Sequence, residues 1–338
     1  MTEQSQENLS LDEVKMLATE ALVGAGASLA NASAVAQSTF LAERDGIRSH
    51  GLMYVPIYAE HVTCGKVIGD ADPVVLSSDG GVVTVDAKNG FAHPAINAGW
   101  DAFIGKAMSE GVGVLTVNQS YNCGVLGHHA QRIAEQGLLG ICFTHAPASI
   151  APPGGATPLI GTNPFAMAVP DQDGGVLMSL DQSASVVAKS EILLCAREGK
   201  PIDPSWAFDE QGQPTPDANA ALKGSMAPAG GYKGYGMGLM VEMLASCLSG
   251  AMLSKDASPF AGTKGGPPAT GQCFMAFNPA KFSGDVFFAQ AAALIEAMRA
   301  QDGAHIPGDK AKGHRQRTQS EGVWVDVSLL ERIRSYRV

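Results

Sequence analysis

A short cluster, Arg48-Ser49-His50-Gly51, carries side chains suited to acid–base chemistry on a small anion. Histidine changes its charge near physiological pH and can donate a proton to an atom that gains negative charge during a reaction. An arginine two residues earlier can hold a carboxylate through paired hydrogen bonds. A lone histidine is also often a structural residue, hydrogen-bonded to its surroundings. The spacing of the cluster is compatible with both interpretations.

Three glycine-rich segments form the second group that could do chemistry. They are Pro152-Pro-Gly-Gly155, Gly161-Thr-Asn-Pro164 and Gly230-Gly-Tyr-Lys-Gly-Tyr-Gly-Met-Gly238. Glycine lets backbone N–H groups approach an anion, and the start of a helix adds a favourable dipole. The third segment precedes an expected helix and contains Lys233, a point charge suited to phosphate or carboxylate. Each segment alone is typical of a tight turn, but three of them in a chain with 17% charged residues favour a cofactor cradle.

Several common catalytic and nucleotide-binding motifs are missing. The sequence has no His-Glu-x-x-His, no Gly-x-Ser-x-Gly, no Gly-x-x-x-x-Gly-Lys-Ser/Thr and no Gly-x-Gly-x-x-Gly. These absences argue against metal hydrolases, α/β-hydrolases, P-loop enzymes and standard Rossmann dehydrogenases. His128 and His129 are adjacent, so on a helix their side chains would diverge by about 100° and could not easily share one metal ion. We therefore expect no metal site.

The composition limits the class of protein. The chain has 338 residues with 40 glycines and 19 prolines, and 45% of its residues are hydrophobic. This suits one large or two medium well-buried domains with many turns and argues against disorder. A formal charge of -10 without a cationic stripe argues against nucleic acid as a partner. Six scattered cysteines, no signal-peptide pattern and no long apolar segment predict a cytoplasmic protein with reduced thiols and no membrane partner.

The elements that must position these residues begin with helices. Ser10 and Glu13 form a capping box, and the apolar spacing after them predicts a helix over 11–23. A second helix is expected over 33–42, whereas Pro56 limits any helix in the segment 46–58 that contains His50. Further helices are expected over 95–109, 126–136, 185–198, 236–249, 285–300 and 328–336.

Strands are expected between these helices. Their ranges are 82–86, 112–117, 139–144, 165–169, 176–180 and 272–277. The segments 147–164 and 199–233 are expected to be long connections, the second with one short helix. The order of elements predicts an α/β protein in three parts. They are an α-rich N-terminal part over 1–110, a central α/β domain over 111–280, and a C-terminal segment over 281–338 that packs back on the first part.

The order of the motifs resembles the malate/L-lactate dehydrogenase family of NAD(P)H-dependent oxidoreductases, which is distinct from the Rossmann-type lactate and malate dehydrogenases. The resemblance spans residues 10–325 and rests on short motifs in a fixed order. They are Ser49-His-Gly51, Pro56-Ile-Tyr58, Asn89-Gly90, Pro153-Gly-Gly155, Gly161-Thr-Asn-Pro164, Asp181, Gly199-Lys-Pro201, Asp217, Gly230-Gly-Tyr-Lys-Gly234 and Gly250. The stretch Gly265-Gly-Pro-Pro268 with Gly271-Gln272 looks most like the sulfolactate dehydrogenase branch.

The resemblance implies a non-Rossmann fold with a mixed-sheet nucleotide-binding domain, a homodimer, NAD or NADP as cofactor, and a small-molecule carboxylate as substrate. It also implies that His50 is the general acid, that Ser49 positions the substrate, and that Asp181 lies near the nicotinamide. With Arg48, proposed above from its chemistry, the residues expected to bind substrate are Arg48, Tyr54, Asn122 and Thr162. Those implied to bind the cofactor are Gly154, Gly155, Gly161, Thr162, Asn163, Ser183 and Lys233.

Four positions depart from the family pattern. Tyr54 stands where an arginine usually anchors the substrate carboxylate, and Asn122 stands in place of a usual histidine. Glu191 replaces a usual lysine, and His145 replaces a frequent asparagine. A tyrosine can donate one hydrogen bond but cannot supply the charged fork of arginine. These changes leave the substrate open.

Three functions are compatible with this pattern. The first is reversible reduction of a small 2-oxo acid to a 2-hydroxy acid, of the malate, lactate or sulfolactate type. The second is reduction of a cyclic ketimine, piperideine- or pyrroline-2-carboxylate, which carries its own positive charge when protonated. The third is nucleotide binding without catalysis.

Overall fold

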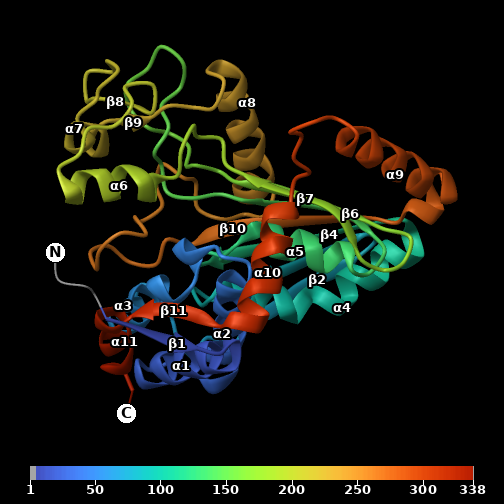
Figure 1. The fold of residues 1–338 in the computed structure, drawn as a ribbon, viewed down its shortest axis with the longest axis horizontal. Coiled ribbons are helices and arrows are strands. Elements are labelled where there is room, and N and C mark those ends of the chain that lie inside the picture. Colours follow the sequence, from blue (N-terminus) through green and yellow to red (C-terminus); the bar gives the residue numbers. More distant parts are fainter. Residues whose placement is uncertain (1–4, 338) are drawn as a thin grey trace.

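The centre of the molecule is a seven-stranded mixed sheet (Figure 1). The computed structural model describes residues 5–337. The strands lie in the order β2-β3-β4-β10-β5-β6-β7; β3 and β4 are parallel, and the other neighbours are antiparallel. Their bounds are β2 (Val74–Asp79), β3 (Val82–Asp86), β4 (Val112–Ser120), β10 (Thr270–Phe277), β5 (Leu139–Thr144), β6 (Phe165–Pro170) and β7 (Val176–Gln182). The predicted α/β class with a mixed, non-Rossmann sheet is confirmed.

Helices α4 (Ala92–Glu110) and α5 (Leu126–Ala134) cover one face of this sheet, where the largest apolar core lies. Gly99 permits the close approach of α4, because a Cβ atom there would lie 2.6 Å from the Leu115 side chain. The other face packs against α8 (Tyr232–Val241) and its continuation, the π-helix η3 (Glu242–Cys247), through Val241 and Ala245.

The sheet extends across the domain boundary expected at residue 110. β2, β3 and α4 precede that residue in sequence, yet β3 pairs with β4 and α4 packs in the same core. The apolar side chains of α4 pack in the core of the sheet. The edge strand of the sheet is β2, so the sheet begins in sequence at Val74.

A helical layer at the N-terminus contains α1 (Leu11–Gly24), α2 (Leu29–Arg44) and α3 (Val55–Thr63). The predicted capping box is present, because Ser10 Oγ accepts from the Glu13 N–H and the Glu13 carboxylate accepts from the Ser10 N–H. The C-terminus returns to this layer: β11 (Val323–Asp326) pairs antiparallel with β1 (Gln6–Leu9), and α11 (Val327–Arg334) adds to the same core. Figure 1 shows β1, β11 and α11 beside α1 in this layer.

A small lobe follows the C-terminal end of β7, at the upper left of Figure 1 and at the same end of the strands as the N-terminal layer. It contains α6 (Lys189–Glu198), α7 (Ala218–Lys223) and the short strands β8 (Ala207–Phe208) and β9 (Ser225–Met226). Its own apolar core includes Ile150, Ile160 and Ile192. In this lobe, the 150–160 loop therefore packs against α6, α7 and β9, which precede α8 in the sequence.

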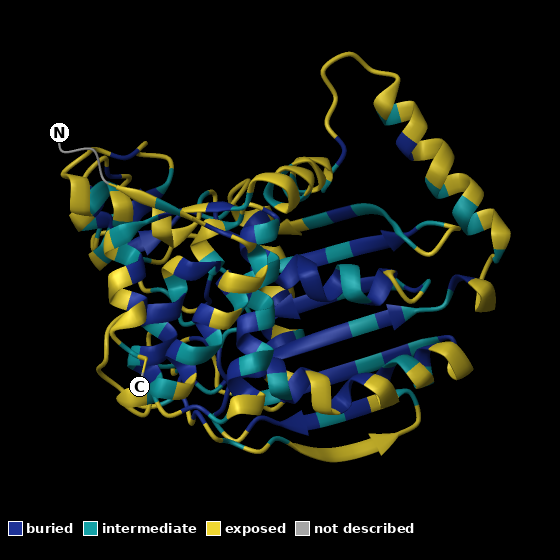
Figure 2. Cartoon of the chain, turned by 60° about the horizontal axis from the view of Figure 1, so that its bottom comes forward, coloured by how far each residue is buried: buried dark blue, intermediate teal, exposed yellow. Residues whose placement is uncertain are grey.

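Two helices close the chain before β11. α9 (Asp285–Arg299) projects along the sheet edge, and Figure 2 shows that almost all of it is exposed; Ile295 is its one buried residue. α10 (Asp309–Glu321) crosses back toward α2 and α5 (Figure 1). The C-terminal segment thus packs on the N-terminal layer through α10, β11 and α11, while α9 does not.

Four elements differ from the sequence expectation. α3 forms despite Pro56, because proline at the second position of a helix breaks no hydrogen bond. β2 is exposed along its length, and α10 has no fully buried residue; neither carries an apolar stripe that would have identified it. The helix expected to begin at residue 185 starts at Lys189, because Ser185 forms an isolated bridge with Pro228.

No helix within residues 5–337 is long and apolar enough to cross a membrane. Residues 1–4, part of the segment used to argue against a signal peptide, lie outside the described residues.

Candidate active site

The turn that carries His50 follows directly on α2 and consists of two short 3-10 helices, η1 (Arg48–His50) and η2 (Leu52–Tyr54). The buried carboxylate of Glu43 accepts a hydrogen bond of 2.7 Å from the backbone N–H of Leu52. Glycine is required at position 51, because a Cβ atom there would lie 2.1 Å from Glu43 Oε1. Burial raises the pKa of Glu43, and the Leu52 hydrogen bond and the charge of Arg48 oppose this rise. The glycine of the Ser-His-Gly motif thus lets the turn close against α2.

His50 is half-buried, and two neighbours fix its ring. Its Nδ1 atom lies 3.1 Å from Ser49 Oγ, and its ring stacks on that of Tyr54 with 6.2 Å between centroids. The contact with Ser49 occupies Nδ1 and leaves Nε2 for proton transfer. Desolvation, followed by the charge of His128, lowers the pKa of His50. His50 is therefore a stronger acid than a histidine in water.

Tyr54 and Asn122 supply neutral polar groups next to His50. The Tyr58 hydroxyl donates to Asn122 Oδ1 at 2.9 Å, and the backbone N–H of Gly124 donates to the same oxygen at 3.2 Å. The Asn122 carbonyl is thus occupied, and its amide N–H groups remain as donors. Burial raises the pKa of Tyr54 to about 12, and hydrogen bonds with Tyr121 and Asn122 oppose this rise. Both side chains are uncharged at neutral pH.

Tyr58, Tyr121 and Phe260 were not among the site residues expected from the sequence, yet they line the same region. Tyr54 and Tyr58 meet edge to face at 4.7 Å, and Tyr121 packs edge to face on Phe260 at 5.2 Å. Tyr54 and Tyr58 are four residues apart, which puts them on one side of a helical segment, and that spacing could have identified them. Phe260 arrives from 139 positions beyond Tyr121, and no sequence pattern links the two.

The loop that carries Phe260 is fastened to α3 by two residues that sequence reasoning also missed. Lys66 donates from Nζ to the carbonyl oxygens of Pro259 and Gly262, at 2.5 and 3.0 Å. His61 lies with Nε2 3.0 Å from the Gly262 oxygen and hydrogen-bonds Tyr121 through Nδ1. These contacts hold the loop against the aromatic side chains.

Asp181 lies at the end of β7 and is bound to the first turn of α5. Its Oδ2 atom accepts a hydrogen bond of 2.7 Å from the backbone N–H of Gly127. Water reaches the carboxylate, but protein surrounds it closely, and this desolvation raises its pKa against the effects of Gly127 and His128. Asp181 can therefore hold a proton at higher pH than an aspartate in water.

Two of the glycine-rich segments meet. Gly238, in α8, packs against Ile160 and Ala184, so that a Cβ atom there would lie within 2.9 Å of both. Asn163 is fully buried, and its amide donates to the Gly238 oxygen and to Glu242 Oε2, both at 2.9 Å. Its polar atoms are therefore used inside the protein. Thr162 is half-buried, and its carbonyl accepts the Ala184 N–H at 2.8 Å.

The Gly230–Gly238 segment is not the loop that we expected. The helix begins at Tyr232, so Lys233 lies in its first turn and is exposed. Gly234 permits this early start, because a Cβ atom there would lie 2.0 Å from the Ala229 oxygen. Gly230 and Gly231 both have positive φ, and no side chain caps the helix. An uncapped helix start beside a lysine suits an anion.

The other residues expected to bind the cofactor or substrate have the following surroundings. Gly154 and Gly155 form the exposed tip of a turn, in which the Gly155 N–H donates to the Pro152 oxygen at 2.8 Å. Gly161 is buried, and it lies so close to the backbone of residue 146 that a Cβ atom would be 2.1 Å from the Ala146 oxygen. Ser183 Oγ lies 3.0 Å from Ser185 Oγ. Arg48 is exposed and lines a cavity of about 50 Å³ with Glu43, Met53 and Trp324.

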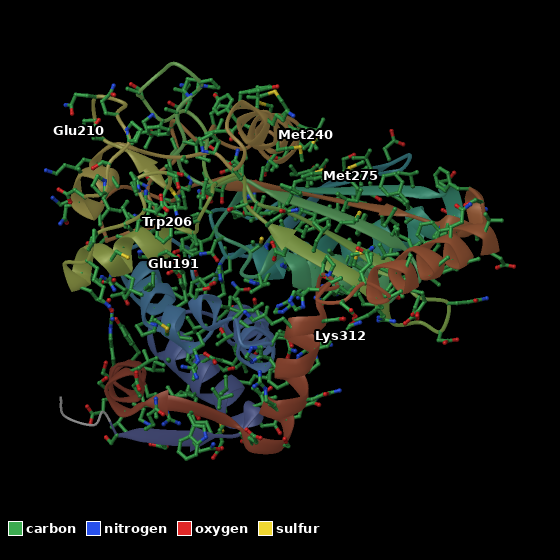
Figure 3. All side chains as sticks on the ribbon, turned by 45° about the horizontal axis from the view of Figure 1, so that its top comes forward. Glu191, Trp206, Glu210, Met240, Met275 and Lys312 are labelled. Atoms are coloured by element: carbon green, nitrogen blue, oxygen red, sulfur yellow. The ribbon has the colours of Figure 1, made fainter. Side chains whose placement is uncertain are left out.

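Two departures from the family pattern have local structural explanations. Glu191 is exposed in the first turn of α6, where a negative charge complements the helix dipole (Figure 3). His145 is buried and its Nδ1 accepts the Gly271 N–H at 3.2 Å.

His128 and His129 bind different partners, Asp45 and the Cys123 oxygen. Across residues 5–337 no group of three His, Cys, Asp or Glu side chains could hold a metal ion.

The family model for malate/L-lactate dehydrogenase matches residues 9–334. The chain belongs to that family. It is 38% identical to an NADP-dependent (2R)-3-sulfolactate dehydrogenase of Chromohalobacter salexigens, over 98% of each chain. It is 36% identical to a Δ1-pyrroline-2-carboxylate reductase of Ancylobacter novellus, over 97% of this chain and 96% of the relative.

A solved structure supports the same assignment. The Δ1-piperideine-2-carboxylate reductase of Pseudomonas syringae pv. tomato superposes with a TM-score of 0.91, at 32% identity, over 98% of this chain and 99% of the other. The chain is therefore an enzyme, an NAD(P)-dependent oxidoreductase of the 2-oxo acid/2-hydroxy acid type. The non-catalytic alternative is not retained.

Proposed function

We propose that this enzyme reduces the C=O or C=N carbon next to a carboxylate, with His50 as the proton donor. The observation that carries the proposal is the geometry of His50, whose Nδ1 is held by Ser49 while Nε2 remains for the substrate. Bound NAD(P)H supplies a hydride to the carbon. His50 donates its proton to the oxygen or nitrogen, and its lowered pKa makes that transfer easier.

We propose that the nucleotide phosphates bind at the start of α8. The two positive-φ glycines, the uncapped helix and exposed Lys233 suit a dinucleotide with negative charge. Thr162 and Ser183 lie on the segments that pack beside Gly238 and Ala184, and Asn163 shapes this region from inside. Gly154, Gly155 and Gly161 remain candidates for contacts through their backbone. Asp181 would face the nicotinamide end.

We propose 2-oxo acids as the first substrate class. Tyr54 stacks on His50 and Asn122 lies beside Tyr54 and Tyr58, and both can bind a carboxylate as neutral groups. Arg48, two residues before His50 on an exposed turn, adds positive charge that attracts an anionic substrate. A half-buried Thr162 completes the candidate substrate contacts.

A cyclic ketimine is the second candidate, and one observation favours it. The groups beside His50 are neutral, and the surrounding rings of Tyr54, Tyr58 and Tyr121 are aromatic. A protonated imine carries a positive charge, which aromatic faces attract and an arginine would repel. The neutral pair at Tyr54 and Asn122 therefore suits a cationic ring better than it suits a dianion.

Initial rates with NADH and NADPH test the function and separate the two candidates. The panel contains pyruvate, oxaloacetate, sulfopyruvate, pyrroline-2-carboxylate and piperideine-2-carboxylate. A kcat/KM at least about tenfold higher for the 2-oxo acids supports the first class, and the reverse supports ketimines. Absence of cofactor oxidation with every substrate would contradict the proposal.

We also propose that the enzyme is a homodimer that joins through α9. Val286 and Leu294 are more than half exposed on this helix, and Phe282 just before it is 65% exposed. Exposing large apolar side chains to water is unfavourable, and packing this helix against a second copy of the chain would bury them. Leu294→Asp should turn a dimer into a monomer in sedimentation analysis, whereas Gln316→Glu on the polar helix α10 should not. A wild-type monomer would contradict the proposal.

We propose that the enzyme acts in the cytoplasm. All six cysteines are free, and Cys64 and Cys247 are exposed. Exposed free thiols persist in a reducing compartment. Fractionation of the native cells with an antibody would test this.

A further inference from the structure

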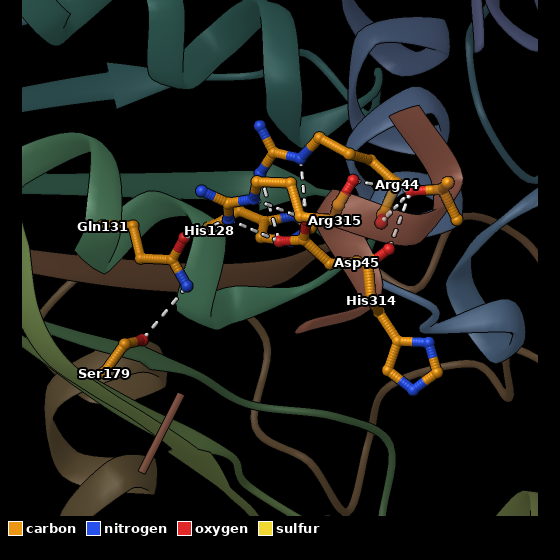
Figure 4. Close-up of polar contacts among 8 residues, drawn as sticks. Arg44, Asp45, His128, Gln131, Ser179, His314 and Arg315 are labelled. Carbon is orange, nitrogen blue, oxygen red and sulfur yellow. Dashed lines mark hydrogen bonds and ion pairs between the residues drawn. The ribbon is translucent and has the colours of Figure 1, made fainter. Parts of the chain in front are cut away.

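One buried carboxylate joins three distant parts of the chain. Asp45 caps the C-terminus of α2, and its side chain has no exposure to solvent. It accepts from Arg44 Nε at 2.7 Å, from Arg315 Nη2 at 2.8 Å and from His128 Nε2 at 3.1 Å (Figure 4). Burial raises the pKa of Asp45, but the hydrogen bonds from His128, Arg315 and Arg44 outweigh it and hold the pKa well below its usual range. The carboxylate is thus charged at every working pH.

His128, one partner of this carboxylate, is adjacent to the residue that binds Asp181. It lies on α5 immediately after Gly127, whose N–H holds the Asp181 carboxylate at 2.7 Å. The His128 side chain is 93% buried, and within the described residues its Nδ1 has no hydrogen-bond partner. Its position is therefore fixed from the Nε2 side, by Asp45.

The other partner, Arg315, reaches the strand of Asp181 by a second route. Arg315 Nη2 lies 3.3 Å from Gln131 Oε1, and Gln131 Nε2 donates to Ser179 Oγ at 3.1 Å (Figure 4). Ser179 is two residues before Asp181 on β7. The strand is thus linked to Asp45 through α5 and through α10.

Asp45 is also five residues before His50, at the start of the turn that carries it. The same carboxylate therefore anchors the His50 turn on one side and the Asp181 strand on the other. We propose that Asp45 and His128 form a positioning pair that fixes His50 relative to Asp181 across the junction between the N-terminal helices and the sheet. This inference rests on the proposed function of His50. His128 is a positioning residue, because it acts through Asp45 and Gly127.

Charge provides a readout that packing alone would not. The titratable and charged groups around His128 are Asp45, His50, His93, His129, Asp181 and Arg315. The charge of His128 contributes to the lowered pKa of His50 and acts against the raised pKa of Asp181. Removing the imidazole should therefore raise the pKa of His50.

The test compares His128→Gln with His128→Leu in the full-length enzyme. Glutamine can still donate to Asp45, whereas leucine cannot. His128→Leu should lower kcat by about 10- to 100-fold with KM for the cofactor within about twofold, because small displacements of catalytic groups cost rate. His128→Gln should recover most of kcat. His314→Gln, one residue from Arg315 but with its ring outside the Asp45 contacts, is the matched control (Figure 4).

Two measurements decide the inference without turnover. An NMR titration of the His50 imidazole should give a higher pKa in both variants than in the wild type. Hydrogen–deuterium exchange over residues 46–54 should increase in His128→Leu and stay unchanged in His128→Gln. Unchanged exchange and an unchanged His50 pKa in both variants would overturn the inference, as would equal kcat losses in both without a pKa change.

The same experiments keep this inference separate from the proposed function. If wild-type enzyme turns over no substrate, the proposed function fails, and the NMR and exchange results still accept or reject the positioning pair. If wild-type enzyme is active and His128→Leu matches it in rate and exchange, the positioning pair fails and the function stands.

Discussion

At the scale of single residues, chemistry is easier to predict than contacts. The Ser-His-Gly cluster pointed to His50, and the structure gives that histidine a fixed Nδ1, a free Nε2 and a lowered pKa. Sequence spacing could not reveal Asp45 as the residue behind it, because its partner Arg315 lies 270 positions away. For Asn163 the motif suggested a cofactor contact, but its side-chain amide donates hydrogen bonds to Gly238 and Glu242 inside the protein.

His50→Ala gives the residue-scale prediction. Loss of the proton donor should lower kcat by about 10²- to 10⁴-fold, because general acid catalysis contributes that much. His305→Ala is the matched control, since His305 is exposed on the connection between α9 and α10. Steady-state rates near pH 7 measure both. Wild-type kcat in His50→Ala would remove His50 from the mechanism.

At the scale of elements, apolar periodicity predicted what is buried and missed what is not. Six of the seven strands of the central sheet, all but β2, and the helices α4 and α5 have apolar faces, and the sequence located them closely. α10 has no apolar stripe and is held instead by polar contacts to α2 and α5, which a local pattern does not encode. Pro56 argued against a long helix in its segment, but it lies at the second position of α3, where proline breaks no hydrogen bond.

Two glycine substitutions test the account of the His50 turn. Gly51→Ala should lower activity by about tenfold or more, because the new methyl group must displace the Glu43 carboxylate that holds Leu52. Gly105→Ala on α4 meets nothing within 4 Å and should raise stability by about 0.5–1 kcal/mol without changing the rate. Rates and urea unfolding measure both effects. Full activity in Gly51→Ala would show that the turn does not need this close approach.

At the scale of the whole molecule, the fold closes on itself through pairs that the sequence separates. β1 and β11 join the two ends of the chain, and the buried histidines His93 and His129 sit between α4, α5 and the sheet. Burial lowers the pKa of His93 to about 3 and that of His129 to about 4. The folded protein therefore keeps both rings neutral well below the pH at which an unfolded chain protonates them.

The pH dependence of stability follows from these two groups. An unfolded histidine has a pKa of about 6.5, so the unfolded state takes up protons first as the pH falls. Their stabilising contribution is complete above pH ~6.5 and is lost as the pH falls toward 4. The Tm should therefore drop by about 5 °C or more between pH 7.5 and 5. Thermal scans across that range check this, with exposed His305→Gln keeping the wild-type slope. A Tm that is constant or rises toward pH 5 would contradict it.

The most direct test of the central claim follows the hydride itself. Wild-type enzyme is given NAD(P)H that carries deuterium at both C4 positions, together with the best substrate from the panel, and the product is analysed by mass spectrometry. We expect one deuterium at the carbon next to the carboxylate and, in His50→Ala, a slower reaction with the label at the same carbon. A product without deuterium at that carbon would contradict the assignment of this enzyme as a hydride-transferring reductase.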